Sequence, residues 1–225
     1  MPVTMTMHPA KPGTGILFRR SDLPGMPEVP ADSRYITSTM RATTLEKGPA
    51  KVFTVEHLLS ALYALNIDNC IIEMDSPEPP VGDGSAKTFV DMVEEAGIEE
   101  QDEEIPVLTL DRSVAIYEGK KFITALPYDG LRITFTSINP HPLLGTQMVD
   151  IVIDHDSYMK EIASARTIGF TWELEAMRKM GLGKGGTLEN AVVYSETECL
   201  SVPRFKDELV RHKILDILGD IYLIG

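Results

Sequence analysis

The chain has 225 residues and a formal net charge of -13 at pH 7, from 21 Lys and Arg residues against 34 Asp and Glu residues. This length is enough for one large domain or two small domains with real cores. The acidic balance disfavours nonspecific binding to nucleic acid or to an anionic membrane surface. It does not exclude an anionic substrate, because one local Lys or Arg can hold a phosphate.

The cysteines and the apolar runs indicate the expected cellular compartment. The two cysteines, Cys70 and Cys199, form no CxxC pair, so neither a disulfide framework nor a thiolate zinc site is expected. The apolar stretches are too short or too interrupted by charge to span a membrane, and the N-terminal residues do not resemble a signal peptide. We therefore expect a cytoplasmic protein without stable membrane insertion.

Apolar periodicity in the first hundred residues predicts alternating strands and helices. Strands are expected at 3–7, 15–19 and 69–75, with a loop over 21–35. A helix is expected to start near Thr54 as its N-cap, with Glu56 in the first turn. A second helix is expected over 85–95, with Gly97 as its stop.

The acidic residues of 98–105 lead into Pro106 and indicate a linker between two domains, 1–104 and 105–225. After it, strands are expected at 107–110, 113–117, 121–126, 131–136, 149–153 and 190–194, and helices at 171–180 and 205–222. This order of elements favours an α+β fold with the helices grouped on one face of the sheets.

The last predicted helix carries His212 and Asp216 four residues apart. Residues at that spacing share one helix face and can bind one divalent metal together, although most such pairs are solvated charge pairs. The run that contains Glu56 and His57 changes this balance, because it adds a third ligand with a carboxylate beside it. Two histidines, one ligating carboxylate and one free carboxylate are the layout of a metal-dependent hydrolase.

These two runs belong to a larger set of short runs along the chain. They are Thr54-Val55-Glu56-His57-Leu58-Leu59, Ile67-Asp68-Asn69, Asp83-Gly84-Ser85-Ala86, Ser164-Ala165-Arg166-Thr167, Gly169-Phe170, Arg211-His212-Lys213, Asp216 and Gly219-Asp220. With this combination the chain resembles, over nearly its whole length, the zinc-dependent UDP-3-O-acyl-N-acetylglucosamine deacetylases of lipid A and lipopolysaccharide biosynthesis.

The resemblance implies two similar sheet-plus-helix domains that pack with their helices between the sheets, and an active site at their junction. An insert within 107–164 is expected to line an acyl-chain passage. The implied zinc ligands are His57, His212 and Asp216, and the implied general base is Glu56. Thr167 would help to hold the oxyanion and Lys213 would contact the nucleotide-sugar end. Asp220 would orient a catalytic histidine. Ile168 stands where the family usually has Phe, so one substrate contact is expected to differ.

The implied reaction is zinc-dependent hydrolysis of the acetamide of an acylated UDP-sugar, by a chain expected to be monomeric. The family's N-terminal strand is expected before Met1 and its general-acid histidine beyond Gly225, so we expect a fragment with impaired activity. Two alternatives stay open. One is a catalytically dead zinc-binding fragment, and the other is a nucleotide-sugar binding protein that uses no metal.

Overall fold

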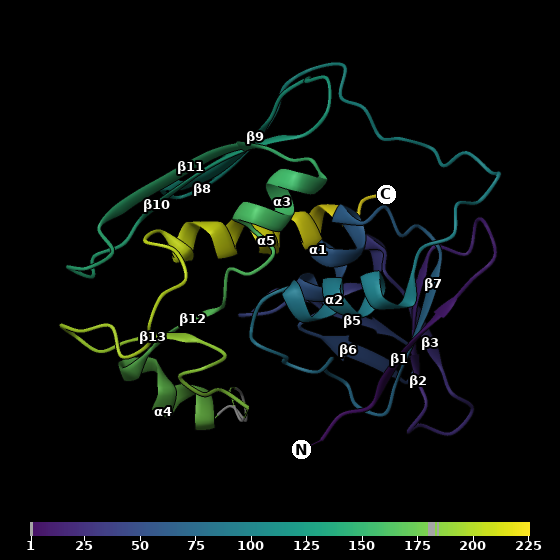
Figure 1. Ribbon diagram of the computed structural model, residues 1–225, viewed down its shortest axis with the longest axis horizontal. Helices are drawn as coiled ribbons and strands as arrows, with labels where there is room; N and C mark the ends of the chain where they lie inside the picture. The colour runs from purple at the N-terminus through teal and green to yellow at the C-terminus, as the bar shows by residue number, and fades with distance from the viewer. Residues whose placement is uncertain (1, 180–182, 184) are drawn as a thin grey trace.

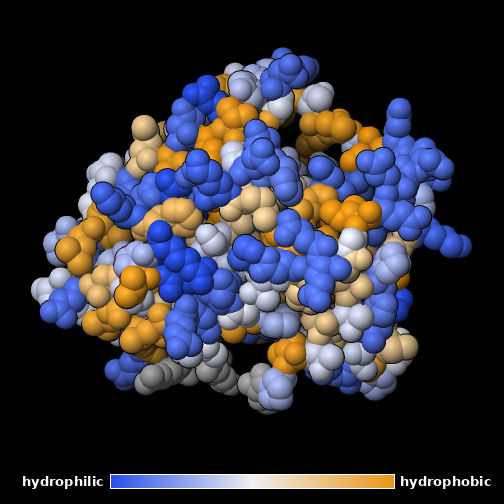
Figure 2. All heavy atoms as spheres, in the orientation of Figure 1, coloured by the Kyte–Doolittle hydropathy of each residue, from blue (hydrophilic) through white to orange (hydrophobic). Residues whose placement is uncertain are grey.

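The computed structural model describes residues 2–179, 183 and 185–225 (Figure 1). Within these ranges the chain is a mixture of α-helices and small β-sheets, so the predicted α+β class is confirmed. No helix in the described ranges combines the length and apolar character that a membrane crossing needs. Hydrophilic side chains, with apolar ones between them, cover most of the face seen in Figure 2.

The N-terminal strands form two sheets. Four strands are neighbours in the larger sheet, in the order β1 (Met5–Pro9), β7 (Cys70–Met74), β2 (Ile16–Arg20) and β3 (Glu28–Pro30). The smaller sheet contains β4 (Ile36–Ser38), β5 (Thr44–Lys47) and β6 (Ala50–Phe53). In the larger sheet β2 and β7 run parallel, and the paired residues Phe18 and Ile72 are fully buried. These two strands therefore form the sheet's contact with the core.

The later strands form three pairs. They are β8 (Val114–Glu118) with β9 (Lys121–Ala125), β10 (Arg132–Ile138) with β11 (Thr146–Val152), and β12 (Ile168–Phe170) with β13 (Val192–Tyr194). The first two pairs are antiparallel hairpins, whereas β12 and β13 run parallel. Every residue of β8 and β9 is exposed, while Ile133 of β10 is buried in the core.

The described α-helices are α1 (Glu56–Ala64), α2 (Lys87–Ala96), α3 (His155–Glu161), α4 (Thr171–Lys179) and α5 (Glu208–Tyr222). Figure 1 shows α1, α2, α3 and α5 in the middle of the molecule, between the N-terminal strands and the hairpin of β10 and β11. One apolar cluster joins them to the sheets and extends from Ile16 to Leu223. The cluster includes residues of both halves, and the division after residue 104 stays a prediction.

Helices α1 and α5 approach each other closely at a glycine. A Cβ added at Gly219 of α5 would clash with the backbone carbonyl of Glu56 at the start of α1. No side chain other than hydrogen fits there, so the close approach of the two helices requires glycine at position 219. This contact sets the distance between the two helices that carry the predicted metal ligands.

Several strand predictions need correction. The predicted strand at 107–110 is wrong, because these residues are exposed and pair with no strand in the described ranges. The loop predicted over 21–35 contains β3 and a short 3-10 helix, Ser33–Tyr35. Pro30 ends β3 without loss of a ladder bond, since β3 is an edge strand. The hairpin of β5 and β6, the short strand β12 and helix α3 were not predicted.

The predicted helices are present, but most of them begin at residues other than the predicted ones. Thr54 is not the N-cap of α1, because its backbone is left-handed with φ 58° and its hydroxyl donates to Glu78 instead. The N-cap is Val55, which provides no side-chain cap. Helix α2 begins at Lys87 rather than at residue 85, and Gly97 is its C-cap, the predicted stop. For the helix predicted over 171–180, the structure gives α4, and residue 180 lies outside the described ranges.

Candidate metal centre and active-site cavity

Helices α1 and α5 bring His57, His212 and Asp216 together, as the sequence analysis predicts. One potential ligand atom of each side chain lies within 4.8 Å of the other two. The Nε2 atoms of His57 and His212 lie 3.6 and 3.4 Å from Oδ1 of Asp216. The two imidazole rings meet edge to face, with their centroids 4.9 Å apart. Three donors of the right type therefore face one point.

The carboxylate of Asp216 provides the test of whether a metal fits. Its Oδ1 atom is buried and makes no hydrogen bond to any residue that the structure describes. Buried polar atoms are normally paired, so an unpaired carboxylate oxygen between two imidazoles needs an explanation. Two imidazole nitrogens and one carboxylate oxygen are a donor set typical of a zinc site with an open position. The residues present therefore fit a divalent metal such as zinc.

Both histidines are held in the form that binds metals. Burial, and then the neighbouring His212, lower the pKa of His57 to about 4. Burial also lowers the pKa of His212. Nδ1 of His212 lies 3.0 Å from the carbonyl oxygen of Ala165, and because a carbonyl only accepts, Nδ1 is the donor. The proton is therefore on Nδ1, and the lone pair of Nε2 is free to bind a metal.

The carboxyl groups of Glu56 in α1 and Asp216 in α5 have pKa values that are shifted in opposite directions. Burial and then the nearby Asp216 raise the pKa of Glu56 to about 8. Burial alone would raise the pKa of Asp216, but His212, Lys213 and His57 lower it below its ordinary value. Asp216 is thus held as an anion, the form that binds a cation. The pKa of Glu56, by contrast, lies near neutral pH, so this carboxyl group can both take up and release a proton.

A cavity of about 190 Å³ opens beside the cluster. It is lined by Thr39, Arg41, Ala42, Thr43, Glu56, Lys213, Asp216 and Asp220. The ammonium of Lys213 donates to Oδ2 of Asp216 at 2.7 Å, so it lies at the wall next to the candidate ligands. The proposed base and the two aspartates of α5 therefore share one polar cavity with a cation at its side.

Sequence analysis missed the loop of residues 39–43. The N–H of Thr43 donates to Oε2 of Glu56 at 3.1 Å, and its hydroxyl donates to Oδ1 of Asp220 at 2.6 Å. The guanidinium of Arg41 forms two contacts of 3.1 Å with the carboxylate of Glu173 in α4. No periodic pattern or motif marks this loop, because its partners lie far away in the sequence.

Thr167 and Ile168 are not among the residues that line this cavity. The N–H of Thr167 donates to the carbonyl of Gly84 at 2.9 Å, and its carbonyl accepts from Val192 at 2.8 Å. A Cβ at Gly84 would clash with the carbonyl of Asn190, so this glycine permits the close packing of the loop. Ile168 begins β12 and packs on an apolar cluster around Val192. Their roles toward a substrate stay predictions.

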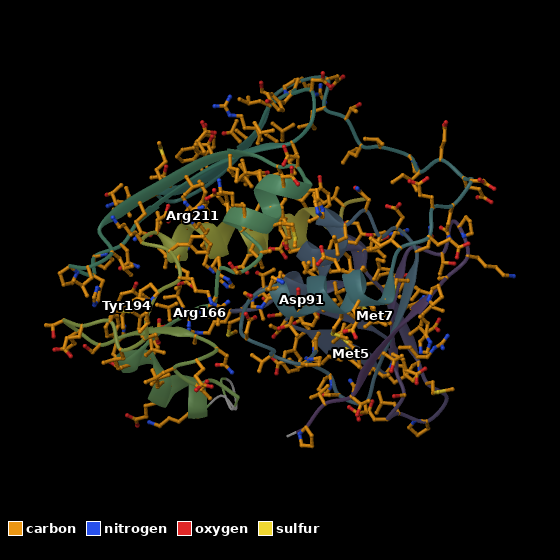
Figure 3. The ribbon with its side chains drawn as sticks, viewed as in Figure 1. Met5, Met7, Asp91, Arg166, Tyr194 and Arg211 are labelled. Carbon is orange, nitrogen blue, oxygen red and sulfur yellow. The ribbon has the colours of Figure 1, made fainter. Side chains whose placement is uncertain are left out.

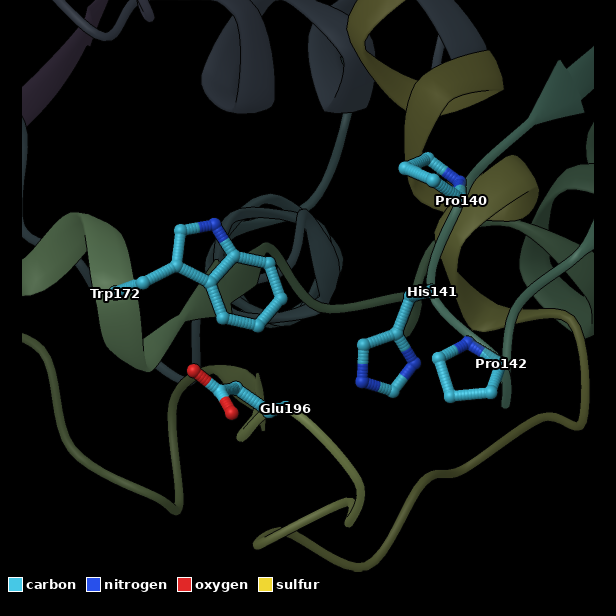
Figure 4. Close-up of a pocket in the computed structure, with 5 residues that line it drawn as sticks. All are labelled: Pro140, His141, Pro142, Trp172 and Glu196. Carbon is cyan, nitrogen blue, oxygen red and sulfur yellow. The ribbon is translucent and has the colours of Figure 1, made fainter.

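A second cavity of about 260 Å³ is lined by Pro140, His141, Pro142, Trp172 and Glu196 (Figure 4). Nε2 of His141 donates to the carbonyl of Ser195 at 2.7 Å, and Nδ1 accepts from the N–H of Leu143 at 3.2 Å. Both ring nitrogens are used by the backbone. His141 therefore joins two loops and has a structural role.

Comparison with known proteins finds sequences that are similar along nearly the whole chain. The sequence profile of the family described as UDP-3-O-acyl N-acetylglycosamine deacetylase matches residues 1–225. A protein of Pseudomonas entomophila (strain L48) named UDP-3-O-acyl-N-acetylglucosamine deacetylase is 44% identical over 227 residues, which cover 99% of this chain and 75% of that protein. Proteins with the same name from Legionella pneumophila, strains Corby and Lens, are 42% identical over the same shares of the two chains.

Proposed function

Since this chain belongs to the UDP-3-O-acyl-N-acetylglucosamine deacetylase family, we propose that it is a zinc-dependent hydrolase that removes the acetyl group from UDP-3-O-acyl-N-acetylglucosamine. The observation that carries the zinc dependence is the unpaired, buried Oδ1 of Asp216 between His57 and His212. The names of the relatives support the substrate.

His57, His212 and Asp216 would hold the metal. A bound zinc ion would keep one position open for water, lower the pKa of that water and polarise the acetamide carbonyl. The remaining chemistry falls to side chains of this chain. It needs a group that removes a proton from the attacking water, a donor for the developing oxyanion, and contacts that hold the nucleotide-sugar.

Glu56 is the proposed general base. Its Oε2 accepts from the N–H of Thr43, and Oε1 would take the proton from the attacking water. Part of the raised pKa of Glu56 comes from the charge of Asp216. A cation bound by Asp216 offsets that repulsion, so the ionised base is favoured when the site is loaded. A base with a pKa near the working pH is the most effective one.

The other predicted residues take supporting roles in this proposal. The hydroxyl of Thr167 would donate to the oxyanion, whose stabilisation is often the largest catalytic effect. Ile168, beside it in the chain, would contact the substrate through its apolar side chain. The ammonium of Lys213 would contact the anionic nucleotide-sugar. Asp220, which accepts from Thr43, would orient the general acid that protonates the leaving amine.

The test combines metal analysis with acetate release from the acylated UDP-sugar. We expect one zinc per chain, and release of acetate that stops on chelation and returns when zinc is added. Acetate release that persists after complete removal of metal would contradict the zinc dependence. A protein that binds one zinc but releases no acetate would instead be a zinc-binding protein without the proposed activity. A protein that binds the nucleotide-sugar without any metal would support the remaining alternative.

A further inference from the structure

One peptide group, between Ala165 and Arg166, is bonded to α5 through both of its polar atoms. The N–H of Arg166 donates to Oε1 of Glu208 at 2.9 Å. On the opposite side, the carbonyl oxygen of Ala165 accepts from Nδ1 of His212 at 3.0 Å. A trans peptide is planar and its N–H and C=O point in opposite directions. The group therefore lies along α5 and is held at both ends.

The spacing of the two partners on α5 matches the length of a peptide group. Glu208 and His212 are four residues apart, so they lie on the same face about one turn, or about 6 Å, from each other. Residues 163–167 lie between α3 and β12 and belong to no helix or strand. The neighbouring N–H groups bond to the backbone elsewhere, that of Ala165 to Ile162 and that of Thr167 to Gly84. Within the peptide group itself, the bond from the N–H of Arg166 to Glu208 is the contact that sets the direction of the Ala165 carbonyl toward His212.

A closed set of buried contacts surrounds Glu208. The side chains of Glu208 and Arg166 are only 1% and 6% exposed, and Nε of Arg166 donates to Oε1 of Glu208 at 3.0 Å. Oε2 of Glu208 accepts from the N–H of Arg204 at 2.6 Å. The guanidinium also donates to the carbonyls of Glu189 and Val202, at 3.1 and 2.7 Å. Figure 3 shows Arg166 between α5 and the strands β12 and β13.

A buried ion pair with all its partners in place allows few other arrangements, because any shift leaves a charge unpaired in a medium of low dielectric constant. The position of the peptide is therefore as rigid as the ion pair that holds it. The carbonyl at its far end decides which nitrogen of His212 carries the proton and how the ring is turned. A metal-binding histidine depends on such a contact for both.

We propose that Glu208 and Arg166 are positioning residues for His212, and that they act through the peptide group between Ala165 and Arg166. The pair keeps the proton on Nδ1 and directs Nε2 toward the point shared with His57 and Asp216. The effect on metal binding rests on the proposed zinc site. The effect on the tautomer of His212 does not, because it concerns a hydrogen bond within this chain.

The test is the variant Glu208→Gln, whose amide has one acceptor oxygen for the four N–H groups that donate to the carboxylate of Glu208. Zinc affinity of the metal-free protein is measured by competition with a chromophoric chelator, and the tautomer of His212 by nitrogen-15 NMR of the imidazole. We expect a loss in zinc affinity of about 10–100-fold and a mixed tautomer. At saturating zinc, the rate of acetate release should fall by a smaller factor than the zinc affinity does.

Glu161→Gln is the matched control. Oε2 of Glu161 accepts from Arg211 at 2.6 Å, so this variant also removes a carboxylate that anchors α5, without touching the peptide. It should lower stability and leave zinc affinity and the tautomer unchanged. Equal losses of zinc affinity in both variants would reduce Glu208 to a general stabilising residue and overturn the proposal.

Arg166→Lys covers the case in which Glu208→Gln does not fold. It keeps the backbone N–H and the positive charge but loses the forked guanidinium, so we expect a smaller loss of zinc affinity. The wild-type protein gives a test that needs no variant, because a proton found on Nε2 of His212 contradicts the proposal directly. If the wild-type protein carries Nδ1–H but binds no zinc, the proposed metal site is wrong and the positioning of His212 still stands.

Discussion

The junction of α1 and α5 lines the polar cavity, and the helix α4 is joined to the cavity wall through Arg41, but the two regions are held by different forces. Fully buried apolar residues, among them Leu58 of α1 and Leu215 of α5, fix the junction within the main core. Among the α4 residues whose side chains the structure describes, 171–176 and 179, none belongs to either apolar cluster. Instead, Glu173 of α4 pairs with Arg41, and Trp172, which is 51% exposed, stacks on Phe170.

The two regions are therefore expected to differ in rigidity. Ligands for a metal must keep their relative positions, and helices locked by apolar burial provide that rigidity. A helix held by an ion pair and a partly exposed aromatic ring is tied more weakly, because solvent screens the pair. We expect the junction to respond strongly to small changes in its residues, and α4 to tolerate them.

The largest effect is expected for Glu56→Gln at the junction. The amide keeps the size of the side chain but cannot take a proton from water, so turnover should fall about 10²–10⁴-fold. Zinc content should stay at one per chain, since Glu56 is not among the proposed ligands. Steady-state rates of acetate release and metal analysis measure the two quantities.

Glu78→Gln is the control for this variant, because Glu78 is exposed and its carboxylate accepts, among the described residues, only from the Thr54 hydroxyl beside α1. It should have normal turnover. Near-normal turnover in Glu56→Gln would remove Glu56 from the mechanism. Loss of zinc together with turnover would show that the carboxylate supports the metal site rather than the proton transfer.

The second effect is expected for Gly219→Ala. The added methyl group would meet the carbonyl of Glu56, so α5 must move away from α1. Overpacking of this kind destabilises a fold by about 3 kcal/mol, and here it also separates His57 from Asp216. Urea unfolding gives the loss in free energy of unfolding, and chelator competition gives the loss in zinc affinity.

Gly169→Ala is the matched glycine near α4. Its Cβ would make only an ordinary contact of 3.9 Å with Val193, and its backbone is not left-handed. We expect little change in stability and in zinc affinity. Similar losses in the two glycine variants would contradict the contrast between a tightly packed junction and a tolerant segment around α4.

How well the sequence predicts each region follows from the range of the interactions. Helices α1 and α5 were predicted because an apolar stripe and an i,i+4 pair are local patterns, and the family resemblance supplied the convergence of His57 with them. Thr43 was missed because its partners, Glu56 and Asp220, are 13 and 177 residues away. The strand predicted at 107–110 is wrong because alternation of apolar residues does not supply a partner strand.

The third effect concerns the packing of α1 on α3. The hydroxyl of Tyr158 is fully buried and lies 3.0 Å from Oγ of Ser60. Tyr158→Phe leaves the serine hydroxyl with only the carbonyls of its own helix, so the free energy of unfolding should fall by about 1–2 kcal/mol. Tyr128→Phe, at an exposed tyrosine, should have no effect. A change below the experimental error for Tyr158→Phe would mean that this buried pair does not help to fix α1.

The smallest effect is expected for Glu173→Gln in α4. The carboxylate of Glu173 and the guanidinium of Arg41 are 31% and 39% exposed, so water and salt screen their attraction. Exposed ion pairs contribute about 0.2–1 kcal/mol, and this pair should lie in that range despite its two contacts. A double-mutant cycle with Arg41→Gln isolates the coupling, which should shrink between low and high salt. The affinity for zinc should not change, because neither residue contacts the proposed ligands. A coupling above about 2 kcal/mol that is insensitive to salt would show that α4 is fixed as firmly as the α1–α5 junction, and the contrast between the two regions would then fail.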